Sequence, residues 1–369
     1  MEEFPFVSVV IPTLNEDTTI ATTLERLVDT IYPSGLLEFL VVDGGSSDKT
    51  RAIAGMMAVF LMKKRGAIIR VIDNPHRRQS AAINLAAEVA NPRSEWLIRC
   101  DCHAEYSFDF VWEVMRAISG LPGRDYAGVV YAVRSRIDSS HCFRNASGWA
   151  FCSKLGGGNS AYRTGTPTAE IDHGWHGAFN REILRSIGGY DTEMIANEDV
   201  DLSWRLRNSG YKLWIAGNLQ VNYITRDTPS ALWKQFSRYG QGRALLMERH
   251  RGAFKPRHLP LVLIVPWTAL VIVTTPVVPA LWLTMLPYVA VLAAATLHAV
   301  RSTGNRCLLW LPLVLAVMHF SWGYGFITQS ARMVRQRLLQ NLDVKGTWEP
   351  RSRERVGRRR HDAARRRTS

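Results

Sequence analysis

The chain has 369 residues, 47% of them hydrophobic, which suffices for one or two domains with a sizeable core. Its formal net charge of +14 is unevenly spread: residues 332–369 hold 13 Lys and Arg against 4 Asp and Glu, so the charge describes a tail and says little about the rest. The five cysteines form no CxxC pair and no even framework, which argues against a disulfide-stabilised secreted domain and fits a reducing cytosol.

Strands and helices are expected to alternate through the first hundred residues. The acidic start lacks an apolar core of signal-peptide length, so this part is expected to stay where it is made. Apolar, β-branched runs predict buried strands at 7–12, 39–43, 68–72 and 95–100. Helical spacing predicts helices at about 20–31, 50–63 and 79–89. Four alternations predict an α/β fold with a doubly wound, mostly parallel sheet.

Ligands of such sheets bind at the carboxyl ends of the strands. The strand ends of this chain carry polar groups at Pro12 to Glu16, Asp43 to Ser46, Asp73 to Arg78 and Asp101 to His103. A dinucleotide-binding site would need G-x-G-x-x-G after the first strand, and residues 12–16 contain no glycine, which argues against hydride transfer.

The fourth strand ends in Asp101-Cys102-His103. An acid and a histidine at this position can hold a divalent cation, and the cation can hold a diphosphate. Alternatively, His103 contacts the diphosphate directly. Cys100 and Cys102 alternate with Asp101 along the strand, so both are expected in the core.

Residues 104–196 show weaker patterns. Periodicity predicts a helix at 108–118 and a strand at 128–133, and the Gly- and Ser-rich segment 152–165 predicts a mobile loop near the site. His173 and His176 flank Trp175, an arrangement that can contact a sugar ring or a phosphate; the alternative is a polar strand with a hydrogen-bonded histidine.

Three motifs together resemble the inverting GT-A glycosyltransferases of family 2: residues 7–16, residues 42–50, and the Glu-Asp pair that opens a helix within 197–206. The resemblance covers roughly residues 5–245 and implies a GT-A fold with a UDP-sugar donor. It implies donor-binding residues at Pro12, Thr13, Glu16, Asp43, Arg78, Asn84 and Asp101. It also implies an acceptor site near Trp175, His176, Gln235, Arg238 and Tyr239.

The resemblance further implies a metal-dependent reaction. The family carries Asp-x-Asp where this chain has Asp101 and His103, so these two residues are the expected ligands of Mg²⁺ or Mn²⁺. Asp199 is the expected catalytic base, with Glu198 beside it; neighbours on a helix point about 100° apart, so only one of the two is expected to face the site. A single base opposite the leaving group implies inversion.

The C-terminal third predicts membrane association. We expect a cytosolic GT-A domain at 1–230, an interfacial amphipathic helix region at 231–258, membrane segments at 259–330 and a basic, disordered tail at 331–369. Residues 259–300 contain no Asp, Glu, Lys or Arg and predict two helices broken near Pro276 to Pro279. Since Arg301, Arg306 and the tail favour the cytoplasm, the third segment, 307–327, is expected to be re-entrant or interfacial.

Within this family, the runs at 101–106 and 226–250 resemble most the succinoglycan-type exopolysaccharide glucosyltransferases of bacteria. This implies an inner-membrane enzyme with a cytoplasmic catalytic domain, which moves a hexose, with glucose the first candidate, to a polyprenyl-diphosphate-linked saccharide. Expected partners are membrane lipid and other polysaccharide-assembly proteins, but not nucleic acid. The alternatives are a polyprenyl-phosphate sugar transferase, a processive synthase and a non-catalytic membrane scaffold with the same fold.

Overall fold

A nine-stranded sheet forms the centre of the N-terminal region. The computed structural model describes residues 4–135, 141–158, 160–164, 167–250 and 252–346. The strands lie in the order β3-β2-β1-β4-β8-β6-β9-β5, and β7 pairs with β9. Their bounds are β1 Phe6–Thr13, β2 Leu37–Asp43, β3 Ile68–Asp73, β4 Ser94–Arg99, β5 Ala104–Glu105, β6 Tyr126–Ser135, β7 Ala169–Ile171, β8 Gly177–Asn180 and β9 Lys212–Tyr223.

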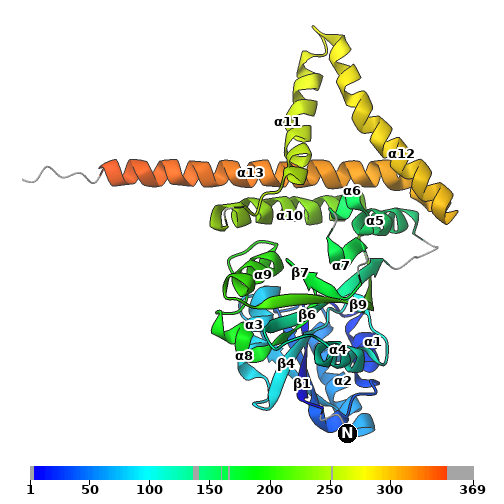
Figure 1. Cartoon of the computed structure of the whole chain (residues 1–369), viewed down its shortest axis with the longest axis vertical. Coiled ribbons are helices and arrows are strands. Elements are labelled where there is room, and N and C mark those ends of the chain that lie inside the picture. The colour runs from blue at the N-terminus through cyan, green and yellow to red at the C-terminus, as the bar shows by residue number, and fades with distance from the viewer. Residues whose placement is uncertain (1–3, 136–140, 159, 165–166, 251, 347–369) are drawn as a thin grey trace, which may run out of the picture. The chain divides into compact units, whose positions relative to one another are not determined.

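The predicted parallel half of the sheet is confirmed. β1 pairs in parallel with β2 and β4, and β2 with β3. Helices α1, α2 and α4 pack on one face, and α3, α8 and α9 pack on the other (Figure 1). Because both faces are covered, nearly every residue of β1 and β2 is buried. The helix bounds are α1 Ile20–Val28, α2 Thr50–Arg65, α3 Gln79–Val89, α4 Phe110–Ser119, α8 Arg181–Ser186 and α9 Glu198–Asn208.

The other half of the sheet is mixed. β8 runs antiparallel between β4 and β6, whereas β6 and β9 are parallel. In the β4–β8 register, Ile98 lies opposite Ala178. This register brings the residues just before β8 alongside the end of β4, where the polar motif begins.

Two sequence predictions for helices and loops need correction. The first helix ends at Val28, and Ile31 lies beyond it with 54% of its surface exposed. The prediction of a mobile loop at 152–165 is wrong for the residues described there. These residues come at the end of α5 (Cys142–Cys152) and form α6 (Lys154–Gly157) and α7 (Ala161–Thr164). The Ser153 side chain caps α6 by accepting a hydrogen bond from the Gly156 amide, a local signal that the glycine-rich composition obscured.

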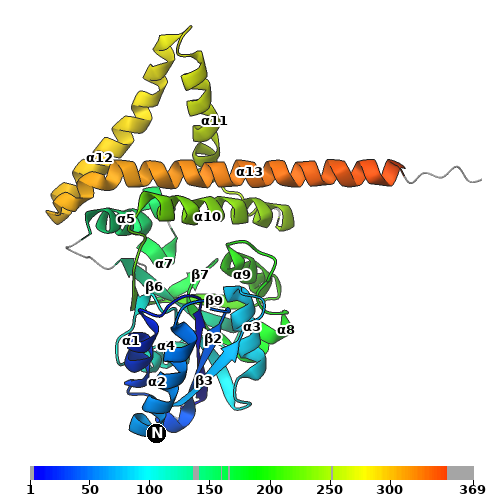
Figure 2. The same cartoon turned by 180° about the vertical axis from the view of Figure 1, so that it is seen from behind.

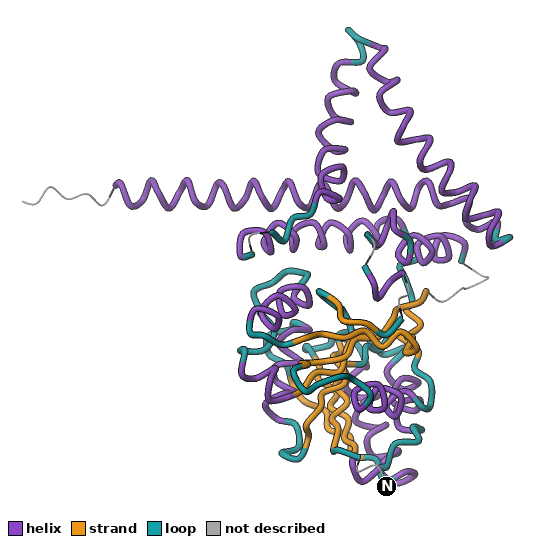
Figure 3. The backbone as a smooth tube through the Cα atoms, in the orientation of Figure 1, coloured by secondary structure: helices purple, strands orange, loops and turns teal. Residues whose placement is uncertain are grey.

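Among the described residues, three helices that follow the sheet are long and apolar enough to cross a membrane: Pro256–Thr274, Pro279–Thr303 and Arg306–Asn341. They contain α11 (Leu259–Thr274), α12 (Leu286–Thr303) and most of α13 (Leu311–Gly346). The predicted break between the first two is confirmed. The chain divides into two units, 1–329 and 330–369. Within the first unit, α11 and α12 form a hairpin, and α10 (Pro229–Arg249) runs beside α13 (Figures 2 and 3).

Glycines allow α10 and α13 to approach closely. A Cβ atom added at Gly240 would lie 2.0 Å from the Trp322 carbonyl oxygen, and one added at Gly325 would lie 2.0 Å from the Ser237 carbonyl oxygen. Each helix therefore presents a glycine to the other's backbone. The structure confirms that the predicted amphipathic segment is a helix, α10, and this helix packs against α13.

The cysteine prediction was wrong in one respect. Cys142, at the start of α5, forms a disulfide with Cys307 in the 3-10 segment between α12 and α13. The two residues are 165 positions apart, so their spacing gave no signal of pairing. Cys100 and Cys102 are buried free cysteines, as predicted.

Candidate active site

Asp101 is the centre of a buried ion pair at the end of β4. Its Oδ1 accepts hydrogen bonds from Arg99 Nε (3.1 Å) and Gln79 Nε2 (3.1 Å). Its Oδ2 lies 2.7 Å from His176 Nε2 and 3.3 Å from Arg99 Nη2. Burial alone would raise the pKa of Asp101, but the charge of Arg99 and the hydrogen bond with His176 hold it well below its usual value. The carboxylate is therefore ionised.

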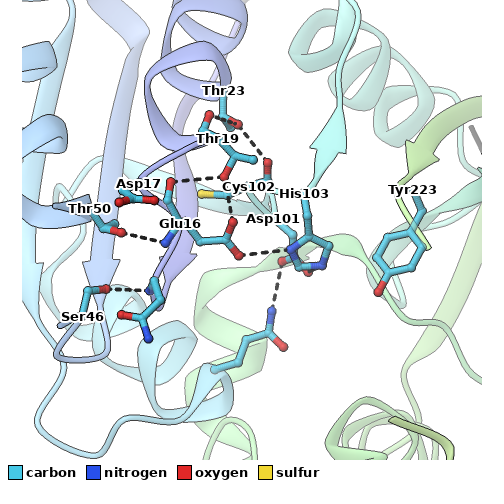
Figure 4. A network of polar contacts seen from close by, with 12 residues as sticks. Glu16, Asp17, Thr19, Thr23, Ser46, Thr50, Asp101, Cys102, His103 and Tyr223 are labelled. Atoms are coloured by element: carbon cyan, nitrogen blue, oxygen red, sulfur yellow. Dashed lines mark hydrogen bonds and ion pairs between the residues drawn. The ribbon is translucent and has the colours of Figure 1, made fainter. Parts of the chain in front are cut away.

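His103 lies between two carboxylates. Its Nδ1 is 3.4 Å from Glu16 Oε1 and its Nε2 is 3.9 Å from Asp101 Oδ2 (Figure 4). The Glu16 side chain is held from the other side by Thr19, whose hydroxyl donates to Oε2 over 2.7 Å. With 30% of its side chain exposed, His103 is open to a ligand, whereas Asp101 is enclosed.

These residues fit a divalent ion in part. Two ligands that bind one ion at about 2.0–2.2 Å each can be up to about 4 Å apart, so the spacing of Asp101 Oδ2 and His103 Nε2 is compatible with a shared ion. Within the described ranges, no three His, Cys, Asp or Glu side chains are grouped to hold a metal. The protein would thus supply two ligands, which suits Mg²⁺ or Mn²⁺ sites completed by phosphate oxygens and water.

Both acids at the start of α9 reach the site. Glu198 and Asp199 line the same cavity, so the expectation that only one would face it is wrong. The preceding residue, Asn197, has a left-handed conformation with φ 63°, and its side-chain amide donates to the Tyr239 carbonyl over 3.0 Å. Burial raises the pKa of Glu198, and the charge of Asp199 raises it further. Glu198 therefore keeps its proton to a higher pH than a free glutamate does.

The cavity extends from these acids to the membrane helices. It has a volume of about 1030 Å³. Its polar wall includes Asp101, His103, Glu198 and Asp199, while α11, α12 and α13 contribute Pro260, Leu261, Ile264, Val291, Met318 and Trp322. One continuous space thus connects the charged residues with apolar side chains of the membrane segments.

Most of the predicted acceptor residues line this cavity: Trp175, Gln235, Arg238 and Tyr239. His176 does not line it, because it is 1% exposed and hydrogen-bonded to Asp101. Trp175 stacks on the His176 ring with a centroid distance of 4.0 Å, so the histidine supports both Asp101 and a cavity wall. The neighbouring His173 lines the cavity instead.

Four of the predicted donor residues, Pro12, Thr13, Glu16 and Asp43, lie at the ends of β1 and β2 or in the loop after β1, and do not line the cavity. Asp43 is 2% exposed and accepts hydrogen bonds from the backbone amides of Gly45 and Ser46, at 3.2 and 3.1 Å. Thr13 donates to Asp43 over 3.3 Å, and Pro12 precedes it in β1. Asp43 thereby fixes the shape of this loop.

The structure does not place Asn84 or Arg78 on the cavity. Both polar groups of the Asn84 amide bind the backbone of Tyr190, at 2.8 and 2.7 Å. Arg78 donates to the Thr192 carbonyl. These contacts tie α3 to the turn before α9.

Sequence reasoning missed several cationic cavity residues, among them Arg163, Arg243 and Arg257. Isolated arginines in polar segments have no periodicity that separates them from surface charge. Arg99 was missed as well, although a charged residue inside an otherwise apolar strand was an available signal.

The chain matches the family model of glycosyl transferase family 2 over residues 8–188 and that of glycosyl transferase family group 2 over residues 173–298. It is 32% identical over 324 residues to the succinoglycan biosynthesis protein ExoA of Rhizobium meliloti (strain 1021), covering 86% of this chain and 93% of that protein. It is 25% identical to the dolichyl N-acetyl-alpha-D-glucosaminyl phosphate 3-beta-D-2,3-diacetamido-2,3-dideoxy-beta-D-glucuronosyltransferase of Methanococcus voltae, covering 87% of this chain and 96% of that one. The solved mannosyltransferase PcManGT from Pyrobaculum calidifontis, in complex with GDP-Man and Mn²⁺, shares the fold with a TM-score of 0.58 and 20% identity, covering 88% of each chain.

Proposed function

Because the chain belongs to glycosyltransferase family 2, we propose that it moves a hexose, with glucose the first candidate, from a UDP-sugar to a polyprenyl-diphosphate-linked saccharide. The membership confirms the resemblance inferred from the motifs, and the mixed sheet confirms the GT-A fold. The proposed place of action is the cytoplasmic face of a bacterial inner membrane.

One observation carries the proposal: the cavity that joins Glu198 and Asp199 to apolar side chains of α11, α12 and α13. A soluble acceptor would not need an apolar extension of the site, whereas a lipid-linked saccharide needs both a polar and an apolar region. Two relatives support the same reading: ExoA acts in succinoglycan biosynthesis, and the name of the Methanococcus voltae enzyme describes a dolichyl sugar phosphate as its substrate.

In the proposed reaction, Asp199 removes the proton of the acceptor hydroxyl as this attacks the anomeric carbon. Glu198, whose pKa is raised by burial and by the neighbouring Asp199, binds a substrate hydroxyl. Attack opposite the leaving diphosphate inverts the anomeric configuration. A divalent ion held by Asp101 and His103 would neutralise charge on that diphosphate.

The test uses the full chain in lipid nanodiscs with a panel of UDP- and GDP-sugars, membrane lipid extract and Mn²⁺. Asp199→Asn is expected to lower the transfer rate by about 10²–10⁴-fold, the usual contribution of a general base, while UDP binding changes less than about twofold. Glu182→Gln is the matched control, because Glu182 is an exposed acid in the first turn of α8.

Transfer that Asp199→Asn leaves unaffected would contradict the base assignment. It would favour a polyprenyl-phosphate sugar transferase, whose acceptor is already an anion and needs no base. Equal loss of UDP binding and of transfer would show that Asp199 holds the donor instead.

A further inference from the structure

Three arginines from separate elements gather in the cavity: Arg163 in α7, Arg243 in α10, and Arg257 in the 3-10 turn before α11. Among the described residues, none of the three forms an ion pair with Asp or Glu. Elsewhere in the described chain, buried or half-buried cations such as Arg99 and Arg205 do have carboxylate partners. Arg163 and Arg243 are half-buried, and cations held partly away from water without acidic partners need another source of negative charge.

Arg163 is held in place but retains unused donors. Its guanidinium stacks 4.0 Å from the centroid of Phe151, and Nη1 reaches the Gly157 carbonyl at 3.5 Å. Its Nε is buried and has no hydrogen-bond partner among the described atoms. A buried N–H without an acceptor is energetically costly, so we expect the Arg163 Nε–H to donate a hydrogen bond to an atom of a bound ligand.

Arg243 links this group electrostatically to the catalytic acids. Burial lowers the pKa of Arg243; the charge of Asp199 opposes this decrease, and the charges of Arg257 and Arg163 add to it. Arg243 therefore lies within range of both the proposed base and the other two cations. A bound anion would relieve the mutual repulsion of the three arginines.

Arg257 connects this group of arginines to the start of α11. It stands two residues before the first residue of α11, and Pro260, Leu261 and Ile264 of that helix line the same cavity. An anion at the arginines would thus share one cavity with the proposed base and with apolar helix surface. A molecule that contains a sugar, a phosphate and a hydrocarbon chain would use all three kinds of surface.

We propose that Arg163, Arg243 and Arg257 bind the phosphate or diphosphate that joins the acceptor's sugar to its lipid. The inference rests on the proposed function and deepens it by assigning the acceptor's anion to a site apart from Asp101 and His103. Arginine suits this site because its planar guanidinium can donate two parallel hydrogen bonds to two phosphate oxygens. The donor's own diphosphate has the same chemistry, so the experiment must distinguish donor binding from acceptor binding at the arginines.

The experiment measures equilibrium binding to the full chain in phosphatidylcholine nanodiscs, without turnover. The probes are farnesyl diphosphate, farnesol, inorganic diphosphate and UDP. Farnesyl diphosphate is expected to bind the wild type more tightly than farnesol or inorganic diphosphate. Arg243→Gln and Arg257→Gln are each expected to weaken farnesyl diphosphate binding about tenfold or more, the scale of one lost charge-assisted contact, with UDP binding within about twofold.

Arg257 is exposed, so its variant is expected to fold even if a substitution at the more enclosed arginines does not. Arg243→Lys keeps the charge but not the fork of donors, and it is expected to recover part of the affinity. Arg185→Gln, an exposed arginine in α8 away from the cavity, is the control and should bind every probe as the wild type does.

The outcomes separate the two proposals. Farnesyl diphosphate that binds wild type and arginine variants equally well would overturn the arginine site and leave the proposed function standing. Wild-type protein that binds farnesyl diphosphate no better than inorganic diphosphate would overturn the lipid-linked acceptor itself. A parallel loss of UDP binding in the variants would assign the arginines to the donor.

Discussion

Replacing Asp101 with Asn separates its role in stability from any role in metal binding. The two side chains have nearly the same shape, so the substitution leaves no cavity; it removes the negative charge and replaces one acceptor oxygen with an NH2 donor. Arg99 is 2% exposed, and its Nη1 already lacks a partner among the described atoms. Without the Asp101 carboxylate, the Arg99 guanidinium loses the largest charge that compensates its burial.

Removing one partner of a buried ion pair costs about 3–5 kcal/mol. At about 2–4 °C per kcal/mol for a domain of this size class, the melting temperature of Asp101→Asn should fall by about 6–20 °C. The assay is thermal unfolding of the full chain in nanodiscs at pH 7, followed by the fluorescence of the tryptophans. Asp43→Asn is the matched control, because Asp43 is also a buried acid at a strand end but its hydrogen-bond partners are neutral.

The difference between wild type and Asp101→Asn should depend on pH. The pKa of Asp101 is lower in the folded state than the unfolded value of about 3.9, so the contribution is complete well above that value and is lost as the pH falls below it. A variant that melts within about 2 °C of the wild type at pH 7, yet loses metal-dependent transfer, would refute the ion-pair reasoning and identify Asp101 as a ligand alone.

Two further predictions concern the helix contact and the metal. Gly240→Leu places a side chain against the Trp322 carbonyl and should destabilise the α10–α13 contact by about 1–3 kcal/mol, which would lower the melting temperature. The control is Gly55→Ala, in open space on α2, which should be neutral or slightly stabilising. Equal melting temperatures for the two variants would contradict the close contact. His103→Asp should retain EDTA-sensitive release of UDP, because a carboxylate replaces the imidazole as a ligand; activity that no divalent ion restores would indicate that His103 contacts the substrate directly.

The sequence predicts the parts of the fold that follow from local pattern. β-Branched runs and helical spacing place β1 to β4, α2 and α3 within two or three residues of their observed bounds. The break in the apolar region near Pro276 is equally local. These features depend on which residues must be buried, and the hydrophobic pattern of the local sequence shows this directly.

Contacts across the chain could not be predicted in this way. The pairing of His176 with Asp101 depends on the antiparallel register of β8, which no nearby residue specifies. The Asn84 amide was expected at the nucleotide, but the turn at Tyr190 occupies it. Periodicity indicates that a polar residue is present and does not indicate which distant group satisfies it.

The contact between the end of the helical hairpin and the catalytic region has a topological consequence. The disulfide fastens the α12–α13 connection to α5, and Leu308 and Leu311 share a buried cluster with Ala150 and Phe151 of that helix. At the other end, the residues that enter α11 line the same cavity as Glu198 and Asp199. If α11 and α12 cross a bilayer, they must cross it an even number of times, because both ends of this segment are fastened to the same domain. The start of α13 would then lie on the same side of the bilayer as the sheet, whatever the hydropathy of α13.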